Sequence, residues 1–211
     1  MKETVEEKRV VYVIDDDASM RDALGSLLAS VGLRVETFGS APDFFGRKLP
    51  DAAICLVVDV RLPGPSGLDF QAELSKANID VPIIFITGHG DIAMSVKAMK
   101  AGAVEFLTKP FRDQDLLDAV KLALEKDETK RKSQKTIAGV RSLFESLTPR
   151  EQEVVAWVTA GLMNKQVAAE MGVSEITVKV HRGNVMRKMR ANTLADLVRM
   201  ADMLGIRRTT A

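Results

Sequence analysis

The sequence predicts a doubly wound α/β domain, a five-stranded parallel sheet covered by helices on both faces, followed by an all-α helix-turn-helix domain of four helices. Over residues 9–125, five runs of strand-forming residues alternate with five segments of helical periodicity, as in parallel sheets with crossover helices. Four helix start signals then follow between residues 148 and 193.

Charge also divides the chain: residues 1–125 carry 14 Lys and Arg against 20 Asp and Glu, whereas residues 126–211 carry 16 against 9. A basic second domain indicates a nucleic-acid partner.

The elements of the first domain follow in order. A strand over residues 9–14 (RVVYVI) stops at three acids, and the helix over residues 18–31 ends at Gly32, a common helix stop. The other expected strands span residues 33–38, 54–59, 81–86 and 104–107, and the other helices begin at residue 40 or span residues 67–77, 92–101 and 113–124. The third strand, ICLVVD, is apolar on both faces, and its Cys55 is expected in the core. Right-handed crossovers favour the strand order 2-1-3-4-5.

The middle of the chain is strongly charged. Residues 125–141 read EKDETKRKSQKTIAGVR, a segment that could extend the preceding helix or form a mobile linker. We expect the helix to continue to about Lys135 and to break near Gly139. The expected domains are therefore residues 8–125 and residues 143–208, joined by a helical linker over residues 126–142.

Helix caps organise the second domain. Thr148 and Glu151 form a capping box with a proline between them. Asn164 and Ser174 are expected to cap helices over residues 165–171 and 175–189, and Thr193 a fourth helix that ends at Gly205. The second and third helices, separated by a three-residue turn, fit a helix-turn-helix motif.

Polar residues follow four of the five strands. Asp15 and Asp16 follow the first strand, Asp59 ends the third, Thr87 the fourth and Lys109 the fifth. The strand order places a topological switch point between strands one and three, where ligands bind at the carboxyl ends of strands. Three converging carboxylates repel one another, so a divalent cation is their natural partner. Oxygen ligands favour Mg²⁺ or Mn²⁺, and a metal-assisted carboxylate at position 59 can attack phosphorus.

The third helix of the second domain has a basic outer face. Val178 and Val185 recur at core-facing spacing, which turns Lys179, Val180, Arg182 and Arg187 outward. Lysine and arginine can neutralise phosphates, and Val180 can meet a thymine methyl group in the major groove. A solvated amphipathic helix remains the alternative.

These residues lie in motifs that resemble two known families. The segments VIDDD, VVDVRLPGPSG, FITGHGD and FLTKPF resemble the receiver domain of two-component response regulators, and LTPRE, GLMNKQVA and TVKVHRGNV resemble the LuxR-type DNA-binding domain. Their combination is that of the FixJ/NarL-type response regulators. The resemblance implies a transcription regulator, and no enzyme beyond slow autodephosphorylation.

The resemblance also implies roles for single residues. Asp59 would be the phosphoacceptor; Asp16, Asp59 and the Arg61 carbonyl would hold the metal, with Asp15 behind them. Thr87 and Lys109 would bind the phosphoryl group, Phe106 would be the aromatic switch residue, and Lys109–Pro110 would be a cis peptide. Lys179, Val180 and Lys188 would contact DNA. Gly183 departs from relatives that carry a longer side chain there, and Arg182 is expected to substitute.

The implied partners are a sensor histidine kinase, double-stranded promoter DNA, a second copy of the chain after phosphorylation, and RNA polymerase. We expect a cytoplasmic protein without membrane contact, because no run approaches the roughly 20 apolar residues of a span and MKETVEEKR is no signal peptide. His89, after Thr87, is expected to be an exposed loop residue rather than a ligand.

Two other functions compete with this one. An aspartate-nucleophile phosphatase would use the same carboxylate, but such enzymes commonly carry an acid two positions later, where this chain has Arg61. Alternatively, the first domain could act only as a scaffold for a DNA-binding protein.

Overall fold

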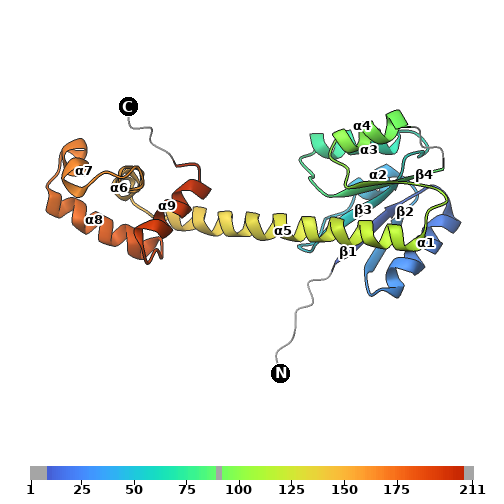
Figure 1. The fold of residues 1–211 in the computed structure, drawn as a ribbon, viewed down its shortest axis with the longest axis horizontal. Helices are drawn as coiled ribbons and strands as arrows, with labels where there is room; N and C mark the ends of the chain where they lie inside the picture. Colours follow the sequence, from blue (N-terminus) through green and yellow to red (C-terminus); the bar gives the residue numbers. More distant parts are fainter. Residues whose placement is uncertain (1–8, 89–91, 207–211) are drawn as a thin grey trace, which may run out of the picture. The chain divides into compact units, whose positions relative to one another are not determined.

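The computed structural model describes residues 9–88 and 92–206 and divides into two compact units between Arg131 and Lys132. The first unit holds a five-stranded parallel sheet in the order β2-β1-β3-β4-β5 (Figure 1), which confirms the predicted topology. Its strands are β1 Val10–Ile14, β2 Arg34–Phe38, β3 Ile54–Asp59, β4 Ile83–Thr87 and β5 Glu105–Thr108. Its helices are α1 Ala18–Ser30, α2 Ala41–Phe45, α3 Gly67–Lys76, α4 Ile92–Lys100 and the first part of α5 Asp113–Glu145.

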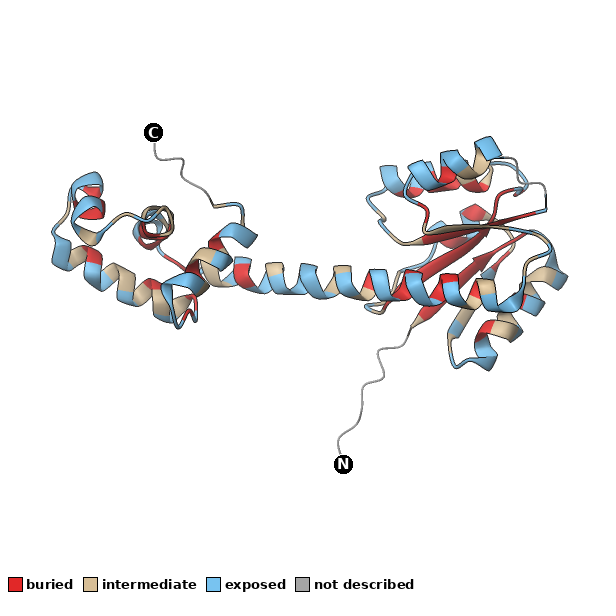
Figure 2. Ribbon diagram, viewed as in Figure 1, coloured by how far each residue is buried: buried red, intermediate tan, exposed pale blue. Residues whose placement is uncertain are grey.

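The central strands form the core of the first unit. Every residue of β1, β3 and β4 is buried (Figure 2), as expected for strands covered on both faces. One face packs against α2, α3 and α4, through residues such as Phe44 and Phe70. The other packs against α1 and α5, through residues such as Leu28 and Leu116. Cys55 lies in this second cluster as expected, and burial raises the pKa of its thiol.

Helix α5 is longer than predicted. The expected break near Gly139 is wrong, because the helix runs without interruption to Glu145. A glycine within a helix costs only about 1 kcal/mol relative to alanine, and packing offsets it: Val140, Leu143 and Phe144 join the apolar core of the second unit.

The early part of α5 is tied to the first unit by polar contacts. Asp127 is 2% exposed and accepts hydrogen bonds from the Ile54 amide at 2.9 Å and from Arg131 Nε at 2.6 Å. Glu128 pairs with Arg9 at 2.7 Å. These contacts fix the helix beyond the end of the apolar pattern that identified it.

The second unit is a small helical bundle with one core. Its helices after α5 are α6 Pro149–Thr159, α7 Asn164–Met171, α8 Glu175–Lys188 and α9 Leu194–Met203. The predicted caps at Thr148, Ser174 and Thr193 are confirmed. The predicted cap at Asn164 is wrong: Met163 is the N-cap residue of α7, and the Asn164 side chain instead accepts a hydrogen bond from Arg182.

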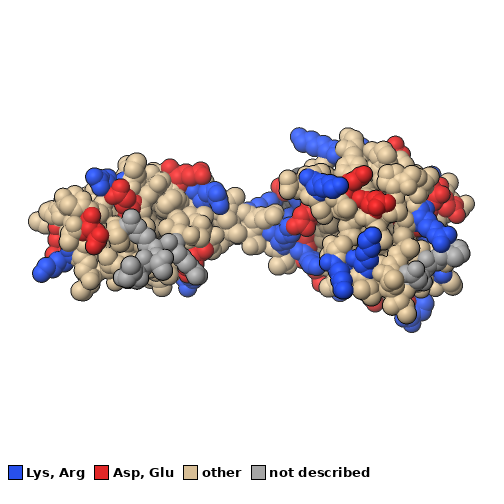
Figure 3. Space-filling model, turned by 90° about the horizontal axis from the view of Figure 1, so that it is seen from above, with Lys and Arg blue, Asp and Glu red and all other residues tan. Residues whose placement is uncertain are grey.

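Charged side chains of both signs occur on both units over the face shown in Figure 3. Among the residues that the structure describes, no helix is long and apolar enough to cross a membrane.

Candidate functional site

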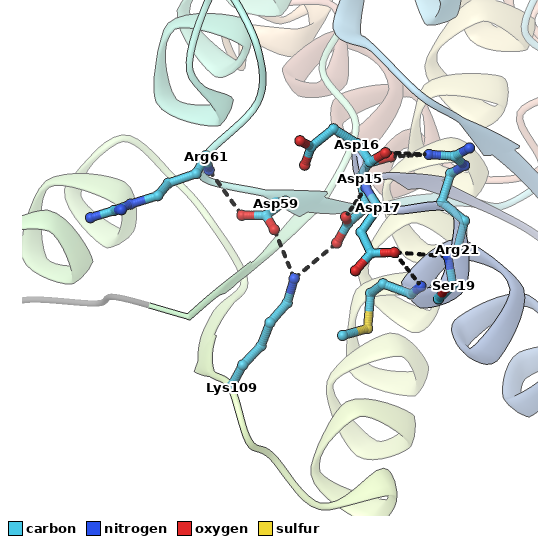
Figure 4. A network of polar contacts seen from close by, with 9 residues as sticks. Asp15, Asp16, Asp17, Ser19, Arg21, Asp59, Arg61 and Lys109 are labelled. Carbon is cyan, nitrogen blue, oxygen red and sulfur yellow. Dashed lines mark hydrogen bonds and ion pairs between the residues drawn. The ribbon is translucent and has the colours of Figure 1, made fainter.

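Four polar residues lie at the carboxyl edge of the sheet because their strands are parallel and adjacent, and three of their side chains are in contact. Asp15 follows β1, Asp59 ends β3, Thr87 ends β4 and Lys109 follows β5. The Lys109 ammonium bridges two of the carboxylates (Figure 4): its Nζ lies 2.9 Å from Asp15 Oδ2 and 2.7 Å from Asp59 Oδ2. Side chains that are far apart in the sequence therefore form one cluster.

The two buried carboxylates are each hydrogen-bonded through both oxygens and differ in their exposure to solvent. Asp15 is 0% exposed, and its other oxygen accepts a 2.9 Å hydrogen bond from the Asp17 amide. Asp59 is 7% exposed, and its Oδ1 accepts a 2.9 Å hydrogen bond from the Arg61 amide. Of the two carboxylates that pair with Lys109, Asp59 is therefore the one that solvent still reaches.

Burial and hydrogen bonding together shift the pKa values of the cluster. Burial raises the pKa of Asp15, although its hydrogen bond from Lys109 opposes this shift. Burial alone would lower the pKa of Lys109, but the hydrogen bonds to Asp59 and Asp15 outweigh it and raise the pKa. Lys109 is therefore held as an ammonium ion.

The acids fit a divalent cation. Asp15, Asp16 and Asp59 each offer one carboxylate oxygen, and these oxygens lie within 4.8 Å of one another. Asp16 is exposed while the other two are buried, so the cluster opens on one side. Oxygen-only ligands with room for water are typical of Mg²⁺ sites.

Two residues that support the cluster were not predicted. Arg21 donates from one guanidinium nitrogen to the backbone carbonyls of Asp15 at 2.7 Å and Asp16 at 3.0 Å. At Gly67, a Cβ atom would lie 2.5 Å from the backbone oxygen of Asp59. Gly67, the second glycine of PGPSG, could have indicated a close approach of two backbone segments. An arginine in a helix gives no indication that it binds backbone carbonyls.

The remaining predicted residues lie around this edge. Thr87 is fully buried, and its carbonyl accepts a 2.7 Å hydrogen bond from the Lys109 amide. Phe106 is partly buried, with its ring centroid 6.4 Å from that of Phe85. The Lys109–Pro110 peptide is cis, as the resemblance implied. His89 lies outside the described residues.

Helix α8 follows α7 after three residues and is anchored by its apolar side. Val178, Val185 and Met189 are fully buried, whereas Lys179, Val180 and Arg187 are exposed, as predicted. This arrangement gives the second unit a helix-turn-helix with a basic outer face.

Two of the five residues predicted to contact DNA are bonded to other helices of the unit, whereas Arg187 is bonded within α8 itself, to Asn184 Oδ1 at 3.4 Å. Arg182 donates to Asn164 Oδ1 at 3.1 Å. Lys188 Nζ lies 2.6 Å from an oxygen of Glu151, which is 3% exposed. Burial would raise the pKa of Glu151, but the hydrogen bonds from Lys188 and Thr148 lower it.

Comparison with known families assigns both units. The family model "Response regulator receiver domain" matches residues 11–121, and the model "Bacterial regulatory proteins, luxR family" matches residues 145–201. Nodulation protein W of Bradyrhizobium diazoefficiens is 61% identical over 94% of this chain and 88% of its own length. Transcriptional regulatory protein FixJ of the same organism is 43% identical over 93% and 96%.

Solved structures agree with these matches. The response regulator StyR has a TM-score of 0.83 and 48% identity, covering 92% of this chain and 98% of its own. Full-length FixJ from B. japonicum has a TM-score of 0.56 and 42% identity, covering 93% and 97%.

Proposed function

Because the chain belongs to the FixJ-type two-component response regulators, transcription factors that join a receiver domain to a LuxR-type DNA-binding domain, we propose that phosphorylation of Asp59 controls DNA binding by α8. We assign residues 8–125 to the receiver, 126–142 to a helical linker and 143–208 to the DNA-binding domain. The family implies a sensor kinase as phosphoryl donor and DNA as target.

The observation that carries the assignment of Asp59 is its ion pair with Lys109 together with its residual exposure to solvent. Asp15 and Asp59 are each hydrogen-bonded through both carboxylate oxygens, but Asp15 is sealed from solvent, and Asp16 is exposed. Of these three acids, Asp59 alone combines partial exposure with an ion pair to Lys109. A carboxylate in that position can attack phosphorus while adjacent positive charge balances the phosphoryl oxygens.

The proposed cation is Mg²⁺, or Mn²⁺ in its place, held by Asp15, Asp16, Asp59 and the backbone carbonyl of Arg61. Such a cation supplies charge that offsets the phosphoryl oxygens. The three carboxylate oxygens within 4.8 Å support this site.

The chain's own residues have distinct parts in the transfer. A bond forms between phosphorus and an Asp59 oxygen as the bond from phosphorus to the donor atom breaks, and the donor leaves with that electron pair. The Lys109 ammonium moves from the Asp59 carboxylate to the new phosphoryl oxygens. Thr87 donates its hydroxyl to the same group, and Phe106 responds to the movement of Thr87.

The output of this switch is proposed to be dimerisation on DNA. Two α8 helices of a dimer can enter adjacent major grooves roughly 34 Å apart. Lys179 and Arg187 would contact phosphates and Val180 a base, since all three are exposed. Arg182 and Lys188 are proposed to act mainly by positioning α8, because they are bonded to Asn164 and Glu151. The site of action is the cytoplasm, where promoter DNA and RNA polymerase lie.

The test uses acetyl phosphate and beryllofluoride on the full-length protein. With Mg²⁺ and acetyl phosphate, the wild type should gain the mass of one phosphoryl group, and Asp59→Asn should gain none. Beryllofluoride should convert the wild type to a dimer in sedimentation velocity and tighten DNA binding. A phosphorylated Asp59→Asn protein, or a treated wild type that stays monomeric with unchanged DNA affinity, would contradict the proposal.

The scaffold alternative gives a different outcome in cells. If the receiver served only as a scaffold, Asp59→Asn would support the same promoter activity as the wild type. We expect instead that this variant no longer responds to the kinase, with equal protein levels verified by immunoblot.

A further inference from the structure

Helix α8 exposes two large apolar side chains that the fold does not use. Ile176, in the first turn, is 77% exposed, and Val180, one turn later, is 59% exposed. Their spacing of four residues places them on the same side of the helix. Single exposed apolar residues are common on protein surfaces, but these two lie on the helix that also exposes Lys179 and Arg187.

The hydroxyl groups of Ser174 and Thr177, near Ile176, form hydrogen bonds at the start of α8 itself. Ser174 Oγ accepts a 3.1 Å hydrogen bond from the Thr177 amide and lies 2.8 Å from the Thr177 hydroxyl. These side chains cap the helix. The N-terminal part of the outer face therefore offers apolar surface to a partner rather than free hydroxyls.

Gly183 continues the same side of the helix, three residues after Val180 and seven after Ile176. A Cβ added there would meet no atom within 4 Å, and its φ is not in the left-handed region. Neither packing nor backbone conformation requires this glycine, although glycine weakens a helix interior. Glycine in such a place allows close approach of the backbone to a partner.

We propose that Ile176 and Val180 together read the 5-methyl groups of thymines in the major groove, and that Gly183 lets α8 approach the bases closely enough to do so. The thymine methyl group is the apolar feature of the major groove, and the N-terminal residues of recognition helices contact base edges. Lys179 and Arg187 supply the phosphate contacts that hold the helix there. This inference rests on the proposed role of α8 and adds Ile176 to the residues that determine sequence preference.

The test replaces thymine by uracil, which removes only the methyl group. Binding sites are first selected from random DNA with the full-length, beryllofluoride-treated protein. Each thymine of the selected site is then replaced by deoxyuridine, and affinities are measured for the wild type, Ile176→Ala and Val180→Ala. For the wild type, we expect affinity to fall about fourfold when uracil replaces a contacted thymine, which corresponds to the free energy of burying one methyl group. Each alanine variant should be insensitive to uracil at one of those thymines.

The controls separate this inference from the function on which it rests. Met203→Ala removes a 40% exposed apolar side chain from α9 and should leave the response to uracil unchanged. Gly183→Ala should raise the thermal midpoint yet weaken binding to the selected site. Two results would overturn the proposed recognition of methyl groups: replacement by uracil that leaves the affinity of the wild type unchanged, or replacement that lowers the affinity of the wild type and of all variants equally. If Lys179→Ala still weakens binding in that case, α8 remains the DNA-binding helix; if Lys179→Ala and Arg187→Ala both bind normally, the proposed role of α8 fails as well.

Discussion

Gly67 allows α3 to begin very close to the strand that carries Asp59. This first helical residue lies against the Asp59 backbone, where an added Cβ would be 2.5 Å from the carbonyl oxygen and 3.1 Å from Val60 Cα. Backbone atoms cannot yield as a flexible side chain can, so any substitution here must displace either β3 or α3. Asp59 thereby depends on a residue that carries no functional group.

Gly67→Ala should destabilise the receiver by about 1–3 kcal/mol, the usual cost of overpacking, and slow phosphorylation by acetyl phosphate. Urea unfolding and the rate of mass gain measure the two effects. Gly25→Ala is the matched control: its Cβ would meet only the Thr37 methyl carbon at 3.8 Å, so a small gain in stability is expected. Equal behaviour of the two variants would contradict the close approach at Gly67.

The residues at the carboxyl edge of the sheet could be predicted because each follows a strand that its apolar run identifies. Asp15, Asp59, Thr87 and Lys109 needed only the strand order to bring them together. Arg21 could not be predicted, because its contacts are with backbone carbonyls and depend on a loop conformation that no residue pattern encodes. The ion pair of Lys188 with Glu151 likewise could not be predicted, because the capping box alone accounts for a glutamate at position 151.

At the scale of elements, the ion pair between Glu151 and Lys188 joins the start of α6 to the end of α8. Glu151 is almost fully buried, whereas the Lys188 side chain is 28% exposed. Removing one partner of a buried pair leaves an uncompensated charge. The pair therefore determines how α8 is held against the rest of the bundle.

Lys188→Met should destabilise the second unit by about 2–3 kcal/mol at neutral pH, less than for a fully buried pair because solvent screens Lys188. The single tryptophan, Trp157 on α6, allows unfolding of this unit to be followed by fluorescence. Because the folded pKa of Glu151 lies below its ordinary value of 4.5, the stabilisation is present above that pH and is lost as pH falls through the folded pKa. The difference between wild type and variant should shrink in this acidic range, and a difference independent of pH would refute the assignment.

Helix α5 shows why sequence patterns underestimate long helices. Its charged middle has no apolar stripe of its own, and Gly139 resembles a helix end. The helix persists because Asp127 accepts a hydrogen bond from the Ile54 amide and Glu128 pairs with Arg9 within the first unit, while Val140 and Leu143 pack in the core of the second. Such tertiary stabilisation has no signature in local propensity.

Gly139→Ala should strengthen α5 by about 0.5–1 kcal/mol, the usual difference between the two residues in a helix interior. An added Cβ there would meet no atom within 4 Å. Slower amide exchange of residues 135–145, measured by mass spectrometry, is the expected sign. Gly139→Pro should instead speed exchange around position 139, and no effect of either variant would indicate that this part of α5 is not helical in solution.

At the scale of the whole molecule, the charges of the two units serve different partners. Residues 1–125 carry an excess of Asp and Glu that includes the three carboxylates proposed to hold the cation, whereas residues 126–211 carry an excess of Lys and Arg. A near-neutral protein can therefore bind DNA through one unit, since phosphate binding depends on local charge rather than on net charge. The salt dependence of DNA binding then measures how many phosphates α8 neutralises.

Lys179→Ala should reduce the slope of log affinity against log salt concentration by about 0.9 for each phosphate that is no longer neutralised, hence by about two for a dimer on an inverted repeat. Fluorescence anisotropy of the beryllofluoride-treated protein between low and physiological salt measures this slope. Lys121→Ala removes an exposed lysine from α5 within the first unit and should leave the slope unchanged. A slope reduced by only about one would mean that a single α8 per dimer touches the phosphates, and an equal reduction in both variants would mean that phosphate binding is not confined to α8.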